Sequence, residues 1–156
     1  MLKYCYERWD KNKDKLEAAL RETDLSDVGY EDLLALVVKH ILNETPHVTF
    51  YAGLDADNIH RIDDGDYQGT LLFLIPEKTY QPSEHGYLMT YIGYGSCACC
   101  DYLQGIRPWD KSEITDETIK KFMSLCKDFI TNMVKPYNHG WRQDDDFEHI
   151  TMEVAE

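Results

Sequence analysis

The fold is decided by two apolar stretches of the sequence, GTLLFLIP (residues 69–76) and YLMTYIGY (residues 87–94). A short apolar run bounded by turn residues is typical of a β-strand, so the first stretch predicts a strand over residues 69–75 that ends at Pro76. In the second stretch, alternate side chains would fall on opposite faces of a strand. One face would carry Tyr87, Met89, Tyr91 and Gly93, and the other Leu88, Thr90, Ile92 and Tyr94.

A third, shorter strand is expected at residues 59–62. The following segment, DDGD (residues 63–66), has the composition of a tight turn, so the strands at 59–62 and 69–75 should form a hairpin. A polar loop then leads to the strand at 87–94. Consecutive strands are most simply joined as neighbours, and the sequence therefore predicts a three-stranded antiparallel meander.

The first third of the chain has helical patterns. Residues 4–21 show a loose one, and residues 30–42 show a clear one, in which apolar residues recur at three- and four-residue spacing. Ser26 or Asp27 would cap the second helix, because their side-chain oxygens can accept hydrogen bonds from free backbone N–H groups. This helix should end near Asn43, shortly before a proline.

A third long helix is expected nearer the C-terminus. Thr115 is a suitable cap, Asp116 and Glu117 suit the positive end of the helix dipole, and Lys135-Pro136 should end the helix. Its buried stripe would consist of Ile119, Phe122, Met123, Cys126, Phe129, Ile130 and Met133. We therefore expect an α+β fold in a single domain of residues 1–156. Two N-terminal helices, a three-stranded antiparallel meander and a long C-terminal helix covering one sheet face would make up this domain.

Acidic residues outnumber basic ones by 29 to 16, which gives a formal net charge of −13 at pH 7. This charge repels phosphate backbones, so we expect no direct binding to nucleic acid, and it favours a basic protein as partner. Asp144, Asp145 and Asp146 form the densest acidic run and are the residues expected to steer such a partner. A solvated surface that only maintains solubility would use the same charges.

Membrane-spanning and targeting segments are not expected. Charge begins at Lys3, the N-terminal residues lack the apolar core of a signal peptide, and no apolar run approaches the roughly 20 residues that cross a bilayer. We therefore expect a cytoplasmic protein that makes no contact with a membrane.

Three of the five cysteines fall within the four residues CACC (97–100). In a reducing compartment they cannot be assumed to pair, so three interpretations stay open: a metal site, a reactive thiol, or packing of small residues. Cys97 and Cys100 are separated by two residues, which lets one turn present two thiolates to a single ion. They are the zinc ligands that we predict.

Structural zinc needs two further ligands. The candidates are Cys99, Asp101, an aspartate of the turn at residues 63–66, His60 and His139. Cys126 lies on the apolar stripe of the third long helix, where a free cysteine usually acts as a small buried side chain. We give Cys5 no chemical role.

No catalytic machinery can be assembled from motifs. The segment around Ser96 does not fit the G-x-S-x-G pattern of a hydrolase, and no nucleophile is accompanied by a base and an orienting group, so we predict that the chain is not an enzyme. Aromatic side chains gather around the predicted meander, where they would serve as interface anchors or as packing. They are Tyr80, Tyr87, Tyr91, Tyr94, Tyr102 and Trp109.

Residues 63–76 (DDGDYQGTLLFLIP) and 87–106 (YLMTYIGYGSCACCDYLQGI) resemble segments of small proteins of bacteriophages and prophages. A small acidic phage protein with a cysteine-bearing metal site is similar in kind to the zinc-containing inhibitors of type II-A CRISPR nucleases, the anti-CRISPR proteins. This resemblance implies a non-enzymatic inhibitor, acting in the cytoplasm of the bacterial host, that binds a lobe of the RNA-guided nuclease and obstructs loading of target DNA. It also implies that Cys97 and Cys100 are zinc ligands.

Two other functions stay open. Charge alone would equally suit an acidic bacterial immunity protein that neutralises a basic toxin. The cysteine tract alone would suit a thiol-dependent enzyme, although the C-x-x-C follows a strand without the βαβ context of a thioredoxin.

Overall fold

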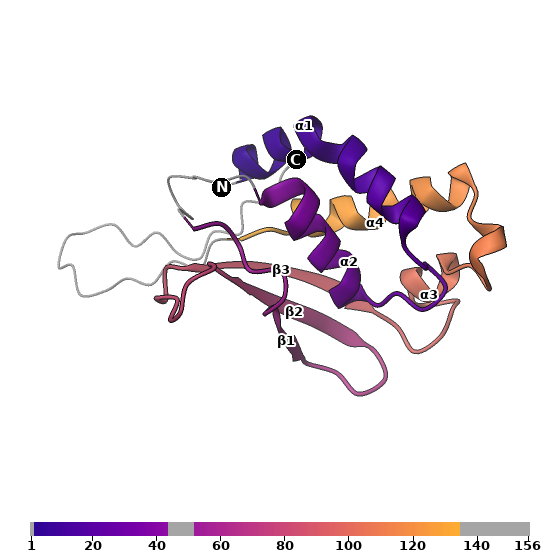
Figure 1. Ribbon diagram of the computed structural model, residues 1–156. Coiled ribbons are helices and arrows are strands. Elements are labelled where there is room, and N and C mark those ends of the chain that lie inside the picture. Colours follow the sequence, from indigo (N-terminus) through magenta and orange to yellow (C-terminus); the bar gives the residue numbers. More distant parts are fainter. Residues whose placement is uncertain (1, 44–51, 135–156) are drawn as a thin grey trace.

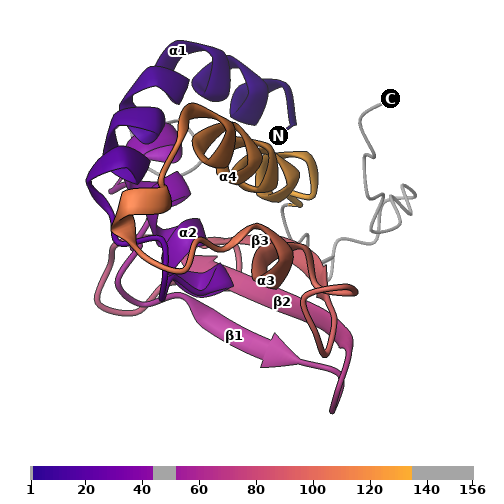
Figure 2. The ribbon, with the colours of Figure 1, turned by 90° about the vertical axis from the view of Figure 1, so that its right-hand side faces the viewer.

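The structure is a computed structural model that describes residues 2–43 and 52–134 (Figure 1). Its longer elements are the helices α1 (Leu2–Glu22), α2 (Tyr30–Val37) and α4 (Asp116–Thr131) and the strands β1 (His60–Asp63), β2 (Gly69–Pro76) and β3 (Tyr87–Tyr94). The shorter elements are η1 (Val38–Leu42), α3 (Tyr102–Ile106) and η2 (Lys111–Glu113). The long helices lie together on one side of the sheet (Figures 1 and 2). This arrangement confirms the predicted α+β fold.

The strands form an antiparallel sheet in the order β1-β2-β3, which confirms the predicted meander. The paired residues run from His60–Leu74 to Asp63–Leu71 between β1 and β2, and from Gly69–Tyr94 to Pro76–Tyr87 between β2 and β3. The bounds of β3 are those predicted. Strand β1 begins and ends one residue later than predicted, and β2 extends one residue further, to Pro76.

The two faces of the sheet differ, because successive side chains of a strand point to opposite sides. The inner face is buried and carries Leu71, Phe73, Ile75, Leu88, Thr90 and Ile92. The opposite face, which we call the outer sheet face, carries Ile62, Leu72, Leu74, Met89 and Tyr91. The last four of these side chains are half-buried, and Ile62 is exposed.

Helix α4 packs against the inner face. The ring of Phe129 meets that of Phe73 edge-on, with centroids 6.0 Å apart. Thr90 Oγ1 donates a hydrogen bond to the backbone oxygen of Phe129 at 2.8 Å. Beyond the helix, Val134 exchanges two backbone hydrogen bonds with Met89 at the edge of β3 that faces away from β2. The prediction that the third long helix covers one face of the sheet is therefore confirmed.

The predicted cap of α2 was wrong. Gly29 is the N-cap residue, and the carboxylate of Asp32 accepts a hydrogen bond from the backbone nitrogen of Gly29 at 2.8 Å. Ser26 instead belongs to a preceding turn, where its backbone nitrogen and hydroxyl both donate to Asp24. The helix continues through the π-helical turn η1 and stops at Leu42, as expected.

The predicted end of α4 was also wrong. Thr115 caps the helix by accepting a hydrogen bond from Thr118 N, as predicted, but the helix ends at Thr131. Asn132 leaves the helical path, and the pairing of Val134 with β3 needs an extended backbone there. Lys135-Pro136 lies outside the described residues. Buried along α4 are Ile119, Phe122, Leu125, Cys126, Phe129 and Ile130, of which the prediction lacked Leu125.

Among residues 2–43 and 52–134, no helix combines the length and the apolar character that crossing a bilayer requires.

Candidate functional site

Residues 95–101, which we call the cysteine loop, form a tight connection between β3 and α3. The backbone oxygen of Cys97 accepts hydrogen bonds from Cys100 N at 2.9 Å and from Asp101 N at 2.8 Å. A Cβ atom on Gly95 would lie 2.8 Å from Cys100 Sγ and closer still to the Cys100 carbonyl group. The turn therefore needs glycine at position 95 because the chain folds back directly onto it.

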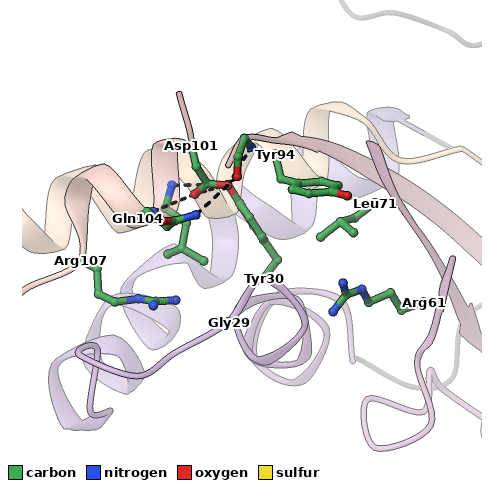
Figure 3. Close-up of a pocket in the computed structure, with 10 residues that line it drawn as sticks. Gly29, Tyr30, Arg61, Leu71, Tyr94, Asp101, Gln104 and Arg107 are labelled. Carbon is green, nitrogen blue, oxygen red and sulfur yellow. Dashed lines mark hydrogen bonds between the residues drawn. The ribbon is translucent and has the colours of Figure 1, made fainter. Parts of the chain in front are cut away.

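A buried carboxylate anchors the cysteine loop (Figure 3). Asp101 is only 4% exposed, and it accepts hydrogen bonds from Gly95 N at 3.0 Å, Gln104 N at 2.8 Å and the Tyr30 hydroxyl at 3.2 Å. The bond from Gln104 caps the N-terminus of α3. Burial raises the pKa of Tyr30 to about 12, so its hydroxyl keeps its proton at neutral pH. Asp101 thus ties the loop to both α3 and α2.

Cys97 and Cys100 present their thiols side by side at the surface. Both residues are exposed, and their Sγ atoms lie 3.0 Å apart. Cys97 N donates to Cys100 Sγ at 3.2 Å, and Ser96 Oγ lies 3.7 Å from the same sulfur. The hydrogen bond from the Cys97 side chain, followed by that from Ser96, lowers the pKa of the Cys100 thiol. The Cys100 thiol therefore ionises more readily than an ordinary cysteine.

The described residues supply only part of the predicted zinc site. Within residues 2–43 and 52–134, no group of three or more His, Cys, Asp and Glu side chains is placed to hold a metal ion. Asp101 already accepts three hydrogen bonds, and His139 lies outside the described residues. A zinc ion on Cys97 and Cys100 would take its remaining ligands from beyond the described residues or from another molecule.

Elemental analysis tests the predicted zinc ion. We expect zinc in protein purified without a chelator, and we expect Cys97→Ser and Cys100→Ser each to lower both the zinc content and the melting temperature. The reason is that bound structural zinc adds its binding free energy to folding. Cys99, a candidate further ligand, forms no metal-binding group of three with Cys97 and Cys100 among the described residues, so Cys99→Ser is the control and should keep the metal. A metal-free parent protein would contradict the prediction, as would serine variants that melt like the parent.

The aspartate-rich turn after β1 has a structural partner. The Tyr94 hydroxyl donates to Asp63 Oδ1 at 2.7 Å and to the backbone oxygen of Gly65 at 2.9 Å. The bond between Tyr94 and Asp63 is the main cause of the lowered pKa of Asp63 and raises the pKa of Tyr94 to about 12. The end of β3 therefore lies beside this turn, but the turn does not join the two thiols in a metal cluster among the described residues.

A cavity of about 240 Å³ lies beside the cysteine loop, lined by residues of α2, α3 and all three strands. Arg61 and Arg107 point into it from opposite sides (Figure 3). Arg107 Nη2 donates to the backbone oxygen of Val28 at 2.6 Å, and Arg61 Nη2 lies 3.0 Å from Asp63 Oδ2. Both guanidinium groups therefore already bind protein oxygens, Arg107 in the segment before α2 and Arg61 within its own strand β1.

The remaining predicted residues are placed as follows. Cys5 and Cys126 are buried, as expected for Cys126, and burial raises the pKa of both thiols to about 12. They are therefore protonated at neutral pH and out of reach of reagents. Asp144, Asp145 and Asp146 lie outside the described residues.

Sequence reasoning missed the role of Asp101. An aspartate just before a short helical segment is a recognisable cap signal. Nothing in the sequence, however, linked it to Tyr30, which lies 71 residues earlier.

No family model, curated protein or solved structure matches this chain. The resemblance to phage proteins and to anti-CRISPR proteins therefore stays a prediction.

Proposed function

We propose that this chain is a non-enzymatic binding protein that engages a basic partner protein through the outer sheet face. The observation that carries the proposal is the row of apolar side chains on this face, while the long helices pack on the opposite face (Figure 2). Ile62 is 49% exposed, and Leu72 and Tyr91 continue its row across β2 and β3. A contiguous apolar patch on a folded protein is typical of an interaction site.

Charged and aromatic side chains lie in the two connections between the strands. Asp64 and Asp66 are exposed in the turn between β1 and β2. Tyr67 in the same turn is 82% exposed, and Tyr80 in the loop between β2 and β3 is 98% exposed. An apolar centre with aromatic anchors and a polar rim has the composition of a protein interface. With a net charge of −13, the complementary surface is a basic one.

An RNA-guided CRISPR nuclease is the partner class that we propose, following the resemblance. Such nucleases hold guide and target in positively charged channels, and an acidic protein bound there would obstruct the loading of target DNA. A basic bacterial toxin is the second candidate, because the same charge complementarity supports an immunity protein. Pull-downs from a bacterial lysate at low and high salt, with the bound proteins identified, distinguish the two. Recovery of neither class would overturn the proposal.

The outer sheet face is tested by truncating its most exposed apolar residue. We expect Ile62→Ala to weaken binding to the recovered partner about tenfold, mainly through faster dissociation, because an apolar contact at the centre of the interface is lost. Lys127→Ala is the control, since it removes an exposed side chain from α4, which packs on the opposite face of the sheet. Equal dissociation rates for Ile62→Ala and the parent would show that the partner binds elsewhere.

Electrostatic steering is proposed to act through Asp144, Asp145 and Asp146. Replacing all three with asparagine keeps their size and removes their charge, so association should slow more than dissociation accelerates. Salt should reduce the association rate of the parent, because the Debye length is about 8 Å at physiological ionic strength. Stopped-flow association rates at several salt concentrations provide the measurement. If the parent and the triple variant have the same association rate at every salt concentration, these three aspartates do not steer binding.

A further inference from the structure

We propose that Cys97 and Cys100 form a reversible intrachain disulfide by exchange with a small disulfide of the glutathione class. The proposal concerns a modification site on the cysteine loop and is independent of partner binding by the outer sheet face. It rests on the placement of the two sulfurs and on the way the loop is anchored.

The two sulfurs are almost within bonding distance. Their separation of 3.0 Å exceeds the length of a disulfide bond by about 1 Å, a gap that small side-chain rotations can close. Both residues are exposed, so a small disulfide in solution can reach them. The hydrogen bonds from Cys100 N and Asp101 N to Cys97 O hold the backbone of the turn in place while the bond forms. Little conformational freedom remains to be lost on closure.

The anchoring of the loop keeps the pair together in the reduced protein. Asp101 fixes the C-terminal end of the turn to Gly95 at its start, and the Tyr30 hydroxyl binds the same carboxylate. A Cβ atom at position 95 would lie 2.8 Å from Cys100 Sγ, so the glycine at the start of the turn leaves this sulfur the space that it occupies. The pairing of the thiols is therefore a property of the folded loop and does not depend on a metal ion.

Geometry also selects which thiols react. Cys99 is exposed, but within the described part of the chain its sulfur makes no hydrogen bond to another sulfur. Cys5 and Cys126 are buried. Of the five cysteines, only Cys97 and Cys100 combine exposure with a neighbouring sulfur among the described residues.

The exchange takes two steps. Cys100, whose sulfur accepts the hydrogen bond from Cys97 N, attacks one sulfur of glutathione disulfide as the thiolate; a mixed disulfide forms and one glutathione thiolate leaves. Cys97 then attacks Cys100 Sγ as the thiolate, which forms the intrachain bond and expels the second glutathione. The two cysteine sulfurs are oxidised, one molecule of glutathione disulfide is reduced to two thiols, and the two cysteine protons end on the glutathione molecules. Excess glutathione reverses both steps.

The test uses the full chain, treated with a chelator so that bound metal does not mask the thiols. The protein is equilibrated in buffers of varied glutathione to glutathione disulfide ratio, quenched with acid, alkylated, digested and analysed by mass spectrometry. As the ratio becomes oxidising, we expect the protein to lose the mass of two hydrogen atoms and to gain protection of Cys97 and Cys100 from alkylation. Added glutathione should restore both.

Three variants sharpen the result. Cys97→Ser should stop the exchange at the mixed disulfide with glutathione on Cys100, because the resolving thiol is missing. Cys100→Ser should give no intrachain bond, and Cys99→Ser should behave like the parent. The proposal is overturned if Cys97 and Cys100 of the parent remain open to alkylation at the most oxidising ratio. It is equally overturned if the parent accumulates the mixed disulfide, or if Cys99→Ser abolishes the bond.

Discussion

Replacing Phe129 with alanine is expected to lower the free energy of unfolding by about 4 kcal/mol. Phe129 is fully buried, and its ring meets Phe73 edge-on with centroids 6.0 Å apart. This contact joins α4 to the inner face of the sheet. Removing the ring leaves a cavity between two elements that other contacts hold apart, so relaxation can close only part of it. The hydrogen bond from Thr90 to the backbone oxygen of Phe129 survives the change, and the measured loss therefore reports on the ring alone.

Urea unfolding of the parent and of two further variants provides the measurement. Phe129→Leu keeps most of the apolar volume and should cost about 1 to 1.5 kcal/mol. Lys127→Ala removes an exposed side chain from the same helix and should change stability by less than about 0.5 kcal/mol. If Phe129→Ala and Lys127→Ala unfold at the same urea concentration, α4 and the sheet do not share one core.

The sequence predicted the sheet and α4 because their apolar periods are clear. Alternation over residues 87–94 and the continuous apolar run of β2 leave one register in which the inner face is buried, since a one-residue slip would expose it. Thr115 at the start of α4 was a readable cap because its side chain serves the helix that directly follows. These signals depend on residues that are close together in the sequence, so tertiary contacts did not alter what they predicted.

The errors concern features that tertiary contacts decide. Helix α4 ends early because Val134 pairs with Met89, a partner 45 residues away that no local pattern indicates. The cap of α2 was misplaced because Gly29 has no capping side chain, and Asp32 supplies the acceptor from within the first turn. Both errors moved an element boundary and left the element itself correct.

The candidate site could be predicted only in part. Spacing identified Cys97 and Cys100, and the structure places their sulfurs in contact. Spacing could not show that Asp101 is buried and accepts a hydrogen bond from Tyr30, so that its carboxylate anchors the cysteine loop. The outer sheet face was visible as an alternation in β3, but which of the two faces the helices would cover depended on how they pack.

Replacing Asp101 with alanine is expected to lower the free energy of unfolding by about 3 kcal/mol, because buried donors that lose their acceptor cost about 1 to 3 kcal/mol each and part of the loop can reach water. The donors are Gly95 N, Gln104 N and the Tyr30 hydroxyl. Tyr30→Phe keeps the ring and removes one of these donors, together with the hydrogen bond that the hydroxyl accepts from Leu103 N at 3.4 Å, so it should cost about 1 to 2 kcal/mol. Asp101→Asn should fall between the two, since the amide keeps one acceptor oxygen and turns the other position into a donor.

Urea unfolding of the variants tests this order of stabilities. Redox titration of the same variants measures the effect on the loop itself. Asp101→Ala should shift formation of the Cys97–Cys100 bond to more oxidising glutathione ratios, and Tyr30→Phe should shift it less. Parent-like stability of Asp101→Ala would mean that the carboxylate does not hold the loop. A parent-like titration at reduced stability would mean that the turn keeps its two sulfurs paired without this anchor.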